Sequence, residues 1–145
     1  MKKILLFVIL SLLIITGCTN KSIQKKSNKE SEEKMSNIKV IINDHSYDLK
    51  LEDNSTAEEF IRLLPQEFSM KELNGNEKYV YIDNYLTTDS YNPKLIEEGD
   101  VMLYGNNCLV IFYKSFETTY KYTKIGHIDN LTDLGDENIT VKFEK

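Results

Sequence analysis

The sequence has few of the residues that build metal sites and disulfides. Its 145 residues include two cysteines, Cys18 and Cys108, two histidines, His45 and His127, and no tryptophan. Neither histidine has another histidine, a cysteine or a close carboxylate at the spacing of metal ligands, so no transition-metal site is predicted. The acidic clusters lack the alternating oxygen ligands of a calcium loop. We therefore expect no metal and no cofactor.

Basic residues are also scarce. Arg62 is the only arginine in the sequence. Residues 37–145 contain 11 Lys and Arg against 20 Asp and Glu, which gives them a formal charge of −9. Nucleic-acid binding needs clustered positive charge, so this balance excludes DNA and RNA as partners. Anionic lipid headgroups repel the same charge, so the protein surface alone would not hold the domain on a membrane.

The first 17 residues have the features of an export signal. They contain no Asp, Glu or Pro, begin with two lysines after the initiator Met, and are mainly apolar at residues 4–15. This run is shorter than the roughly 20 residues of a membrane span, but it has the usual length of a signal-peptide core. The sequence Ile-Thr-Gly-Cys follows at residues 15–18 and resembles a lipobox. We predict cleavage after Gly17 and lipidation of Cys18.

Lipidation of Cys18 would anchor the protein on the extracytoplasmic face of a cell membrane. A cysteine thiolate is the nucleophile that accepts a diacylglycerol, and several acyl chains hold a protein on a bilayer far more firmly than one. Cys108 would then have no partner for a disulfide, so the domain must be held by its core. The alternatives are an ordinary signal peptide, or a membrane-anchor helix, with a chance cysteine.

Composition divides the chain into three parts. After the signal peptide at residues 1–17, residues 18–36 begin with the lipidated cysteine and continue with mainly Lys, Ser, Glu, Asn and Gln. Such a segment buries too little apolar surface to offset the entropy of ordering it, so we expect a flexible polar tether. Residues 37–145 have the size of one ordinary domain.

The domain is predicted to be mainly β. Apolar and polar residues alternate at residues 38–42 and 47–51 around an Asn-Asp-His turn, which predicts an antiparallel hairpin. A long polar loop is expected at residues 83–99, and a second helical turn is possible at residues 129–135. Further strands, several of them joined by turns rich in Asn and Gly, are predicted at residues 68–73, 78–82, 100–104, 108–113, 118–124 and 139–143.

One short amphipathic helix is predicted after the first hairpin. Apolar side chains from Ala57 to Leu64 recur at positions i, i+3, i+4 and i+7 of one helical face. Thr56 and Glu59 have the spacing of a capping box, and Pro65 ends the helix. Many short strands with one or two helical segments predict a small β-barrel.

Three stretches of the domain match a known pattern. They are LNGNEKY at residues 73–79, EGDVMLYGNNCLVIFY at residues 98–113 and YTKIGHID at residues 122–129. With these motifs, residues 37–145 resemble the bacterial cyclophilin-like domain family over essentially their whole length and in the same order of elements. The resemblance implies a small closed barrel of the cyclophilin type. The biochemical role of that family is largely undefined.

The arginine of true cyclophilins, which are peptidyl-prolyl isomerases, has no counterpart at a matching position. That arginine sits beside the proline amide, whose rotation has a barrier of about 18–20 kcal/mol. Arg62 lies in the predicted helix instead of a barrel strand, and lysine lacks the planar fork of donors. We expect no catalytic residue, and keep a weak or divergent isomerase of exported proteins as an alternative.

Aromatic side chains are frequent in the predicted strands. Tyrosine combines an apolar ring with a polar tip, which suits a groove for a peptide or a small molecule. Alternating aromatic residues in strands also form core and cross-strand pairs, which is the alternative interpretation. Cys108 is expected to be an inert thiol in an apolar strand. The residues predicted to line a groove are Tyr79, Tyr81, Phe112 and Phe116.

These features together predict a membrane-tethered extracytoplasmic lipoprotein. Its cyclophilin-like barrel is expected to be a non-catalytic binding module for a peptide or a small molecule. Besides the isomerase, the alternative is a structural protein that contacts another protein of the cell envelope.

Overall fold

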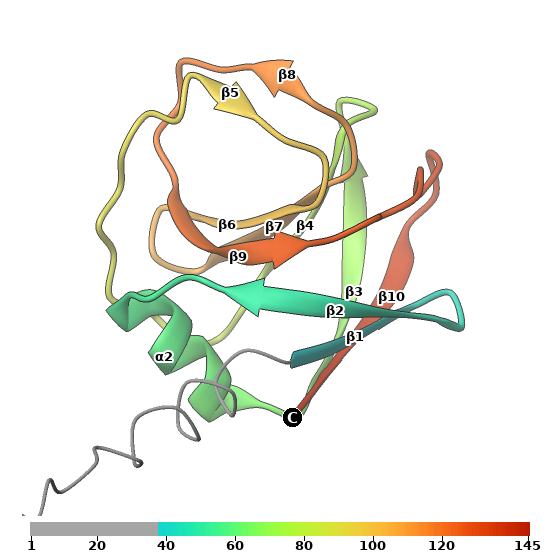
Figure 1. Ribbon diagram of the computed structural model, residues 1–145, viewed down its shortest axis with the longest axis horizontal. Coiled ribbons are helices and arrows are strands. Elements are labelled where there is room, and N and C mark those ends of the chain that lie inside the picture. Colours follow the sequence, from blue (N-terminus) through green and yellow to red (C-terminus); the bar gives the residue numbers. More distant parts are fainter. Residues whose placement is uncertain (1–37) are drawn as a thin grey trace, which may run out of the picture.

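Eight antiparallel strands close into a barrel in the computed structural model, which describes residues 38–145 (Figure 1). The predicted signal peptide, Cys18 and the predicted tether lie outside the described residues. Within residues 38–145, no helix is long and apolar enough to cross a membrane.

The barrel uses most of the strands of the domain. The elements are β1 (Ile38–Ile42), β2 (His45–Leu51), α2 (Ser55–Leu63), β3 (Gln66–Leu73), β4 (Glu77–Tyr81), β5 (Leu95–Ile96), β6 (Asp100–Tyr104), β7 (Cys108–Phe112), β8 (Phe116–Glu117), β9 (Thr123–Ile128) and β10 (Ile139–Glu144). The strand order around the barrel is β1-β10-β3-β4-β7-β6-β9-β2, and β5 pairs with β8 outside it. The prediction of a mainly β fold with a small closed barrel and one short helix is confirmed.

The hairpin turns explain the Asn and Gly residues between the strands. Asn43 and Asp44 join β1 to β2 with φ angles of 48° and 66°, and Asn74 and Gly75 join β3 to β4 with φ angles of 58° and 71°. Two successive residues with positive φ match the right-handed twist of the strands, and Asn, Asp and Gly adopt this conformation most readily.

The barrel interior is a continuous apolar core. Alternate strand residues such as Val40, Leu103 and Ile111 point inward and are fully buried. The apolar face of α2 joins the same core through Phe60, whose ring meets Phe143 of β10 edge to face at 5.2 Å. The predicted amphipathic helix therefore packs against the barrel as its spacing implies.

The predicted capping box of this helix is wrong. Asn54 is the N-cap, and its side-chain oxygen accepts a hydrogen bond of 2.9 Å from the Ala57 N–H. Thr56 is buried, and its hydroxyl donates to the Thr87 carbonyl at 2.6 Å. The Glu59 carboxylate accepts bonds from the N–H and the hydroxyl of Thr87, both at 2.7 Å. Partners in the long loop replace the local pairing that the spacing predicts.

The possible helical turn at residues 129–135 is also wrong. The chain turns at Asn130, where φ is 56°, and then runs without helical hydrogen bonds to β10. Leu131 and Leu134 are buried in the barrel core, so their spacing of three residues reflects tertiary packing. The Asp133 side chain accepts a bond of 2.9 Å from the Gly135 N–H, which supports a turn instead of a helix.

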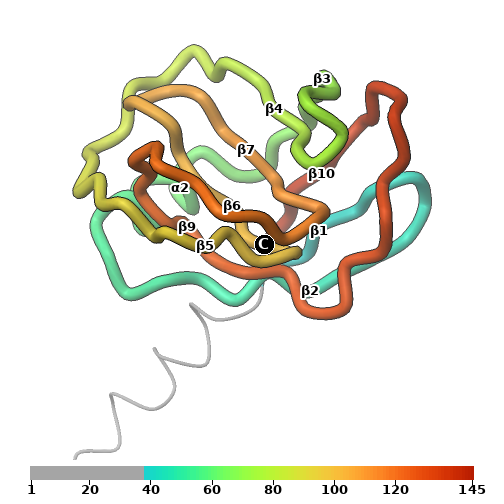
Figure 2. The backbone as a smooth tube through the Cα atoms, turned by 90° about the horizontal axis from the view of Figure 1, so that it is seen from above, coloured from blue at the N-terminus to red at the C-terminus, as the bar shows by residue number. Residues whose placement is uncertain are grey.

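The predicted strand at residues 118–124 is wrong for most of its length, because only its last two residues belong to a strand. Residues 116–117 form β8, and β9 begins only at Thr123. β8 pairs with β5 from the long loop, and Tyr91 bridges to Tyr122. Residues 83–99 and 114–122, here called the arm, form the loop that carries β5 and β8 in Figure 1 and run together along the outside of the barrel in Figure 2.

Candidate functional site

The outer face of β4, β7 and β6 is apolar and is partly covered by the arm. Residues of β6 and β7 that alternate with the inward-facing ones point away from the barrel interior, among them Met102, Val110 and Phe112. Ile96 and Tyr122 of the arm pack against them and complete a second, smaller core. This packing leaves part of the barrel wall open beside the arm.

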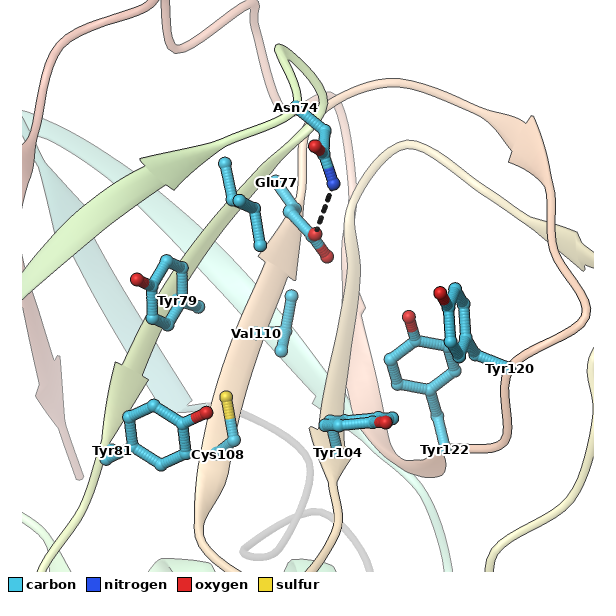
Figure 3. Close-up of a pocket in the computed structure, with 10 residues that line it drawn as sticks. Asn74, Glu77, Tyr79, Tyr81, Tyr104, Cys108, Val110, Tyr120 and Tyr122 are labelled. Carbon is cyan, nitrogen blue, oxygen red and sulfur yellow. Dashed lines mark hydrogen bonds between the residues drawn. The ribbon is translucent and has the colours of Figure 1, made fainter.

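A groove with a volume of about 310 Å³ lies at this open part of the wall (Figure 3). We call it the tyrosine groove because five of the ten residues that line it are tyrosines. Its lining residues are Leu73, Asn74, Glu77, Tyr79, Tyr81, Tyr104, Cys108, Val110, Tyr120 and Tyr122.

The tyrosines form two groups on opposite sides of the groove. Tyr79 and Tyr81 project from β4 on one side, with ring centroids 6.1 Å apart. On the other side, the ring centroid of Tyr104 lies 6.2 Å from that of Tyr120 and 5.6 Å from that of Tyr122. Figure 3 shows these three rings together. Edge-to-face and tilted contacts of this kind hold rings in fixed orientations. Tyr81, Tyr104 and Tyr120 are exposed, so these rings offer their surfaces to a ligand.

Cys108 and Val110 of β7 lie between the two groups of tyrosines (Figure 3). Burial raises the pKa of the Cys108 thiol; the nearby Glu77 carboxylate raises it further, and the Tyr81 hydroxyl offsets only part of this. Burial also raises the pKa of Tyr122 to about 12. Both groups are therefore neutral at physiological pH. A neutral buried thiol is a poor nucleophile, as was expected of Cys108.

Glu77 is the only carboxylic acid among the side chains that line the groove. It is only 9% exposed, and its Oε1 accepts one long bond of 3.5 Å from the Asn74 amide. Figure 3 shows its carboxylate directed between the two groups of tyrosines. Burial raises the pKa of Glu77, the Asn74 amide opposes this, and the charge of Glu72 adds to it. No Lys, Arg or His belongs to the lining.

The structure separates the four predicted groove residues. Tyr79 and Tyr81 line the tyrosine groove. Phe112 is fully buried beneath the arm, where its ring lies 5.6 Å from Phe116 and 5.5 Å from Tyr122. Phe116 lines a second hollow of about 610 Å³ on the arm. The core alternative therefore describes the position of Phe112, and the groove alternative describes the positions of Tyr79 and Tyr81.

Sequence reasoning missed Glu77 and did not select Tyr104, Tyr120 and Tyr122. Glu77 could have been found, because it precedes Tyr79 and Tyr81 at the period of two that places side chains on one face of a strand. The other three tyrosines reach the groove from β6 and the arm. Their convergence depends on the strand order and on how the arm folds back, which no local pattern contains.

Two further ionic clusters lie away from this groove. Inside the barrel, Lys78 is fully buried and its Nζ donates to Glu72 at 2.6 Å and to two backbone carbonyls. On the outside, buried Asp100 accepts bonds from Lys124 at 2.9 Å and from His127 at 3.1 Å. Because both clusters satisfy their own charges, we assign them to stability.

The remaining candidates for chemistry do not converge on a site. Arg62 lies on the exposed side of α2, where it pairs with Glu58 at 3.3 Å, and it lines neither hollow. Across residues 38–145, no group of three or more His, Cys, Asp and Glu side chains is placed to hold a metal ion.

Comparison with known proteins identifies the family of the domain. Residues 40–144 match the model of the cyclophilin-like family. No curated protein and no solved structure gives a significant match. Since the family model spans most of the chain, the chain belongs to the cyclophilin-like family.

Proposed function

We propose that this member of the cyclophilin-like family is an extracytoplasmic lipoprotein whose barrel is a non-catalytic binding module. The tyrosine groove is its binding site, for a short peptide segment or a small molecule. The observation that carries this proposal is the groove itself, in which tyrosines from β4, β6 and the arm surround one buried carboxyl group.

The surfaces of the groove suit binding. Ligand sites are concave and mainly apolar, with a few polar groups that fix orientation. Here aromatic rings and Val110 supply the apolar surface, and Asn74 and Glu77 supply the polar groups at one end. The volume of about 310 Å³ is at the small end for ligand sites. It matches a single side chain or a compact small molecule.

The chemistry of the same residues argues against catalysis there. A nucleophilic cysteine needs a lowered pKa, whereas the pKa of Cys108 is raised. A cyclophilin-type isomerase needs an arginine beside the proline amide, whereas Arg62 pairs with Glu58 on α2. We therefore favour binding over prolyl isomerisation for this groove.

The proposed location at the membrane rests on the sequence that precedes the barrel. The lipobox-like residues 15–18 support an anchor at Cys18, and the polar residues that follow support a tether. The chain enters the barrel at Ile38 in β1, four places from β7 in either direction around the closed strand order. The tether would thus join the side of the barrel opposite β7, which leaves the groove free to face away from the anchor.

Fluorine NMR of the full chain in a non-ionic detergent would test binding. The nine tyrosines would be replaced by fluorotyrosine and their signals assigned with single Tyr→Phe variants. During a screen of short peptides and small molecules, we expect shifts at the groove tyrosines. Tyr47 and Tyr113, which do not line the groove, are internal controls. Shifts confined to tyrosines outside the groove, or no binder at all, would contradict the proposal.

A further inference from the structure

From the arrangement of Glu77 and the tyrosine rings, we infer that the groove takes an organic cation, an ammonium group carried by a lysine side chain or by a small amine. This inference rests on the proposed function and names the ligand class of the same groove. The ammonium group lies among the tyrosine rings, and the Glu77 carboxylate is its counter-ion.

Glu77 lacks a counter-ion of its own in the described part of the chain. The residue is only 9% exposed, and its carboxyl group has one long hydrogen bond, from Asn74 at 3.5 Å. A buried charge without a partner is costly, so such groups pair with an opposite charge or take up a proton. The lysine next to it, Lys78, points into the barrel and is already bonded to Glu72. A ligand cation would supply the missing charge.

The tyrosine rings favour the same ligand class. The face of an aromatic ring carries negative electrostatic potential and attracts ammonium groups within about 6 Å of its centroid. Two groups of tyrosines flank the place toward which the Glu77 carboxylate is directed (Figure 3). An anion would meet a carboxylate, ring faces and phenol oxygens, and no positive side chain belongs to the lining.

The charge of the domain and the size of the groove also favour a small organic cation. Residues 37–145 carry a formal charge of −9, which attracts cations toward the molecule as a whole. The volume of about 310 Å³ admits the end of a lysine side chain or a trimethylammonium group. Larger cations such as a polybasic helix would not enter.

Cation binding should depend on the protonation of Glu77. Burial raises the pKa of Glu77 in the free protein, so a proton competes with the cation for this carboxylate up to a higher pH than at an ordinary glutamate. The titratable groups around Glu77 are Glu72, Cys108 and Tyr122. Glu72 is ionised because its pKa is lowered, and the thiol and the phenol stay neutral. Affinity therefore rises as the pH is raised through the titration of Glu77, and then levels off.

The test is calorimetric titration of the full chain in non-ionic detergent with two pairs of matched probes. Choline is compared with its uncharged carbon analogue, in which a tert-butyl group replaces the trimethylammonium group. A blocked Gly-Lys-Gly peptide is compared with its norleucine counterpart. We expect each cation to bind about fivefold or more tightly than its neutral partner, as cation–π contacts and an ion pair imply. The stronger of the two cations shows whether the natural ligand is a small amine or a peptide.

Two variants assign the effect to the groove. Glu77→Gln keeps the shape of the side chain and should remove most of the preference for the cation and its pH dependence. Glu98→Gln removes the same charge from an exposed position outside the lining and should change neither. If Glu77→Gln does not fold, Tyr120→Leu at an exposed ring serves instead. It should weaken choline binding and leave the carbon analogue unchanged.

The outcomes separate the inference from the proposed function. If the neutral partners bind at the groove tyrosines as tightly as the cations, the inference is wrong and the binding groove stands. Equal effects of Glu77→Gln and Glu98→Gln would also overturn it. If neither cation binds, the inference fails, and the broader peptide and small-molecule screen decides the proposed function on its own.

Discussion

Glu77 and Lys78 are neighbours in β4, but their side chains lie on opposite sides of the barrel wall. Lys78 points inward, where Glu72 and the carbonyls of Gly135 and Glu137 satisfy its ammonium group. Glu77 points outward into the tyrosine groove with one long hydrogen bond. The alternation of a β-strand thus separates a fully paired charge, which serves stability, from a poorly paired one, which we assign to binding.

Replacing Glu77 should stabilise the fold at neutral pH. Burial raises the pKa of Glu77 in the folded state, so folding favours its protonated form. The stability that this form contributes is fully present below the ordinary carboxyl pKa of 4.5 and is lost as the pH rises through the raised pKa. We expect Glu77→Gln to gain about 0.5–1 kcal/mol at neutral pH, a common size for removing one unfavourable group. The gain should shrink in acid.

Urea unfolding of Glu77→Gln and of the unaltered protein, at about pH 4 and about pH 7.5, below and above the ordinary glutamate pKa of about 4.3, measures this difference. Glu98→Gln is the matched control because its side chain is exposed. Equal destabilisation of Glu77→Gln at both pH values would show that Glu77 is a structural residue.

Replacing Lys78 should have the opposite and larger effect. Lys78→Met keeps most of the side-chain volume but removes the ammonium donor from two carbonyls and from the half-buried Glu72 carboxylate, which keeps only the Gly75 N–H and the Tyr113 hydroxyl. Breaking a buried ion pair from one side costs about 3–5 kcal/mol. Lys71→Met at an exposed position of β3 should change the free energy of unfolding by about 0.5 kcal/mol or less. Similar urea midpoints for the two variants would contradict this assignment.

The cap of α2 offers a test of the fold at a single residue. Asn54→Ala removes the side-chain oxygen that accepts the Ala57 N–H, so we expect a loss of about 1 kcal/mol in the free energy of unfolding. Asp53→Ala, next to it and exposed, is the control. If the capping box of Thr56 and Glu59 formed instead, Asn54→Ala would be nearly neutral.

Comparing lipid labelling of variants at the two cysteines tests the anchor. Growing cells with a fatty-acid analogue should label the unaltered protein and the Cys108→Ala variant equally, whereas Cys18→Ala should carry no label. We also expect the lipidated protein to react slowly with a thiol reagent, because its only free thiol is the buried Cys108, whose pKa is raised. Label retained by Cys18→Ala would refute the lipoprotein proposal.

Local patterns predicted the elements that depend on local chemistry. The alternation of apolar residues and the Asn and Gly turns marked most of the barrel strands, and the apolar face of α2 marked the helix. The loop at residues 83–99 was predicted, but its pairing with residues 114–122 was not, because residues 118–121 alternate like a strand although they pair with no barrel strand. At residues 129–135, Leu131 and Leu134 have helical spacing but fill the barrel core from a segment without helical structure.

The candidate site also contains residues that a local pattern can select and residues that only the tertiary structure brings together. Tyr79 and Tyr81 share one face of a single strand, so the sequence alone was enough to select them. Tyr104 and Tyr120 join them only because β6 lies beside β7 and the arm folds back over both. Phe112 lies on the outer face of β7, and only the cover provided by the arm decides that it is buried.

A structure of the protein with a ligand from the screens tests the central claim most directly. We predict that the ligand lies between Tyr79 and Tyr104 in the tyrosine groove, with a cationic group near the Glu77 carboxylate. A ligand bound in the second hollow beside Phe116, or at another surface of the barrel, would contradict the assignment of the groove.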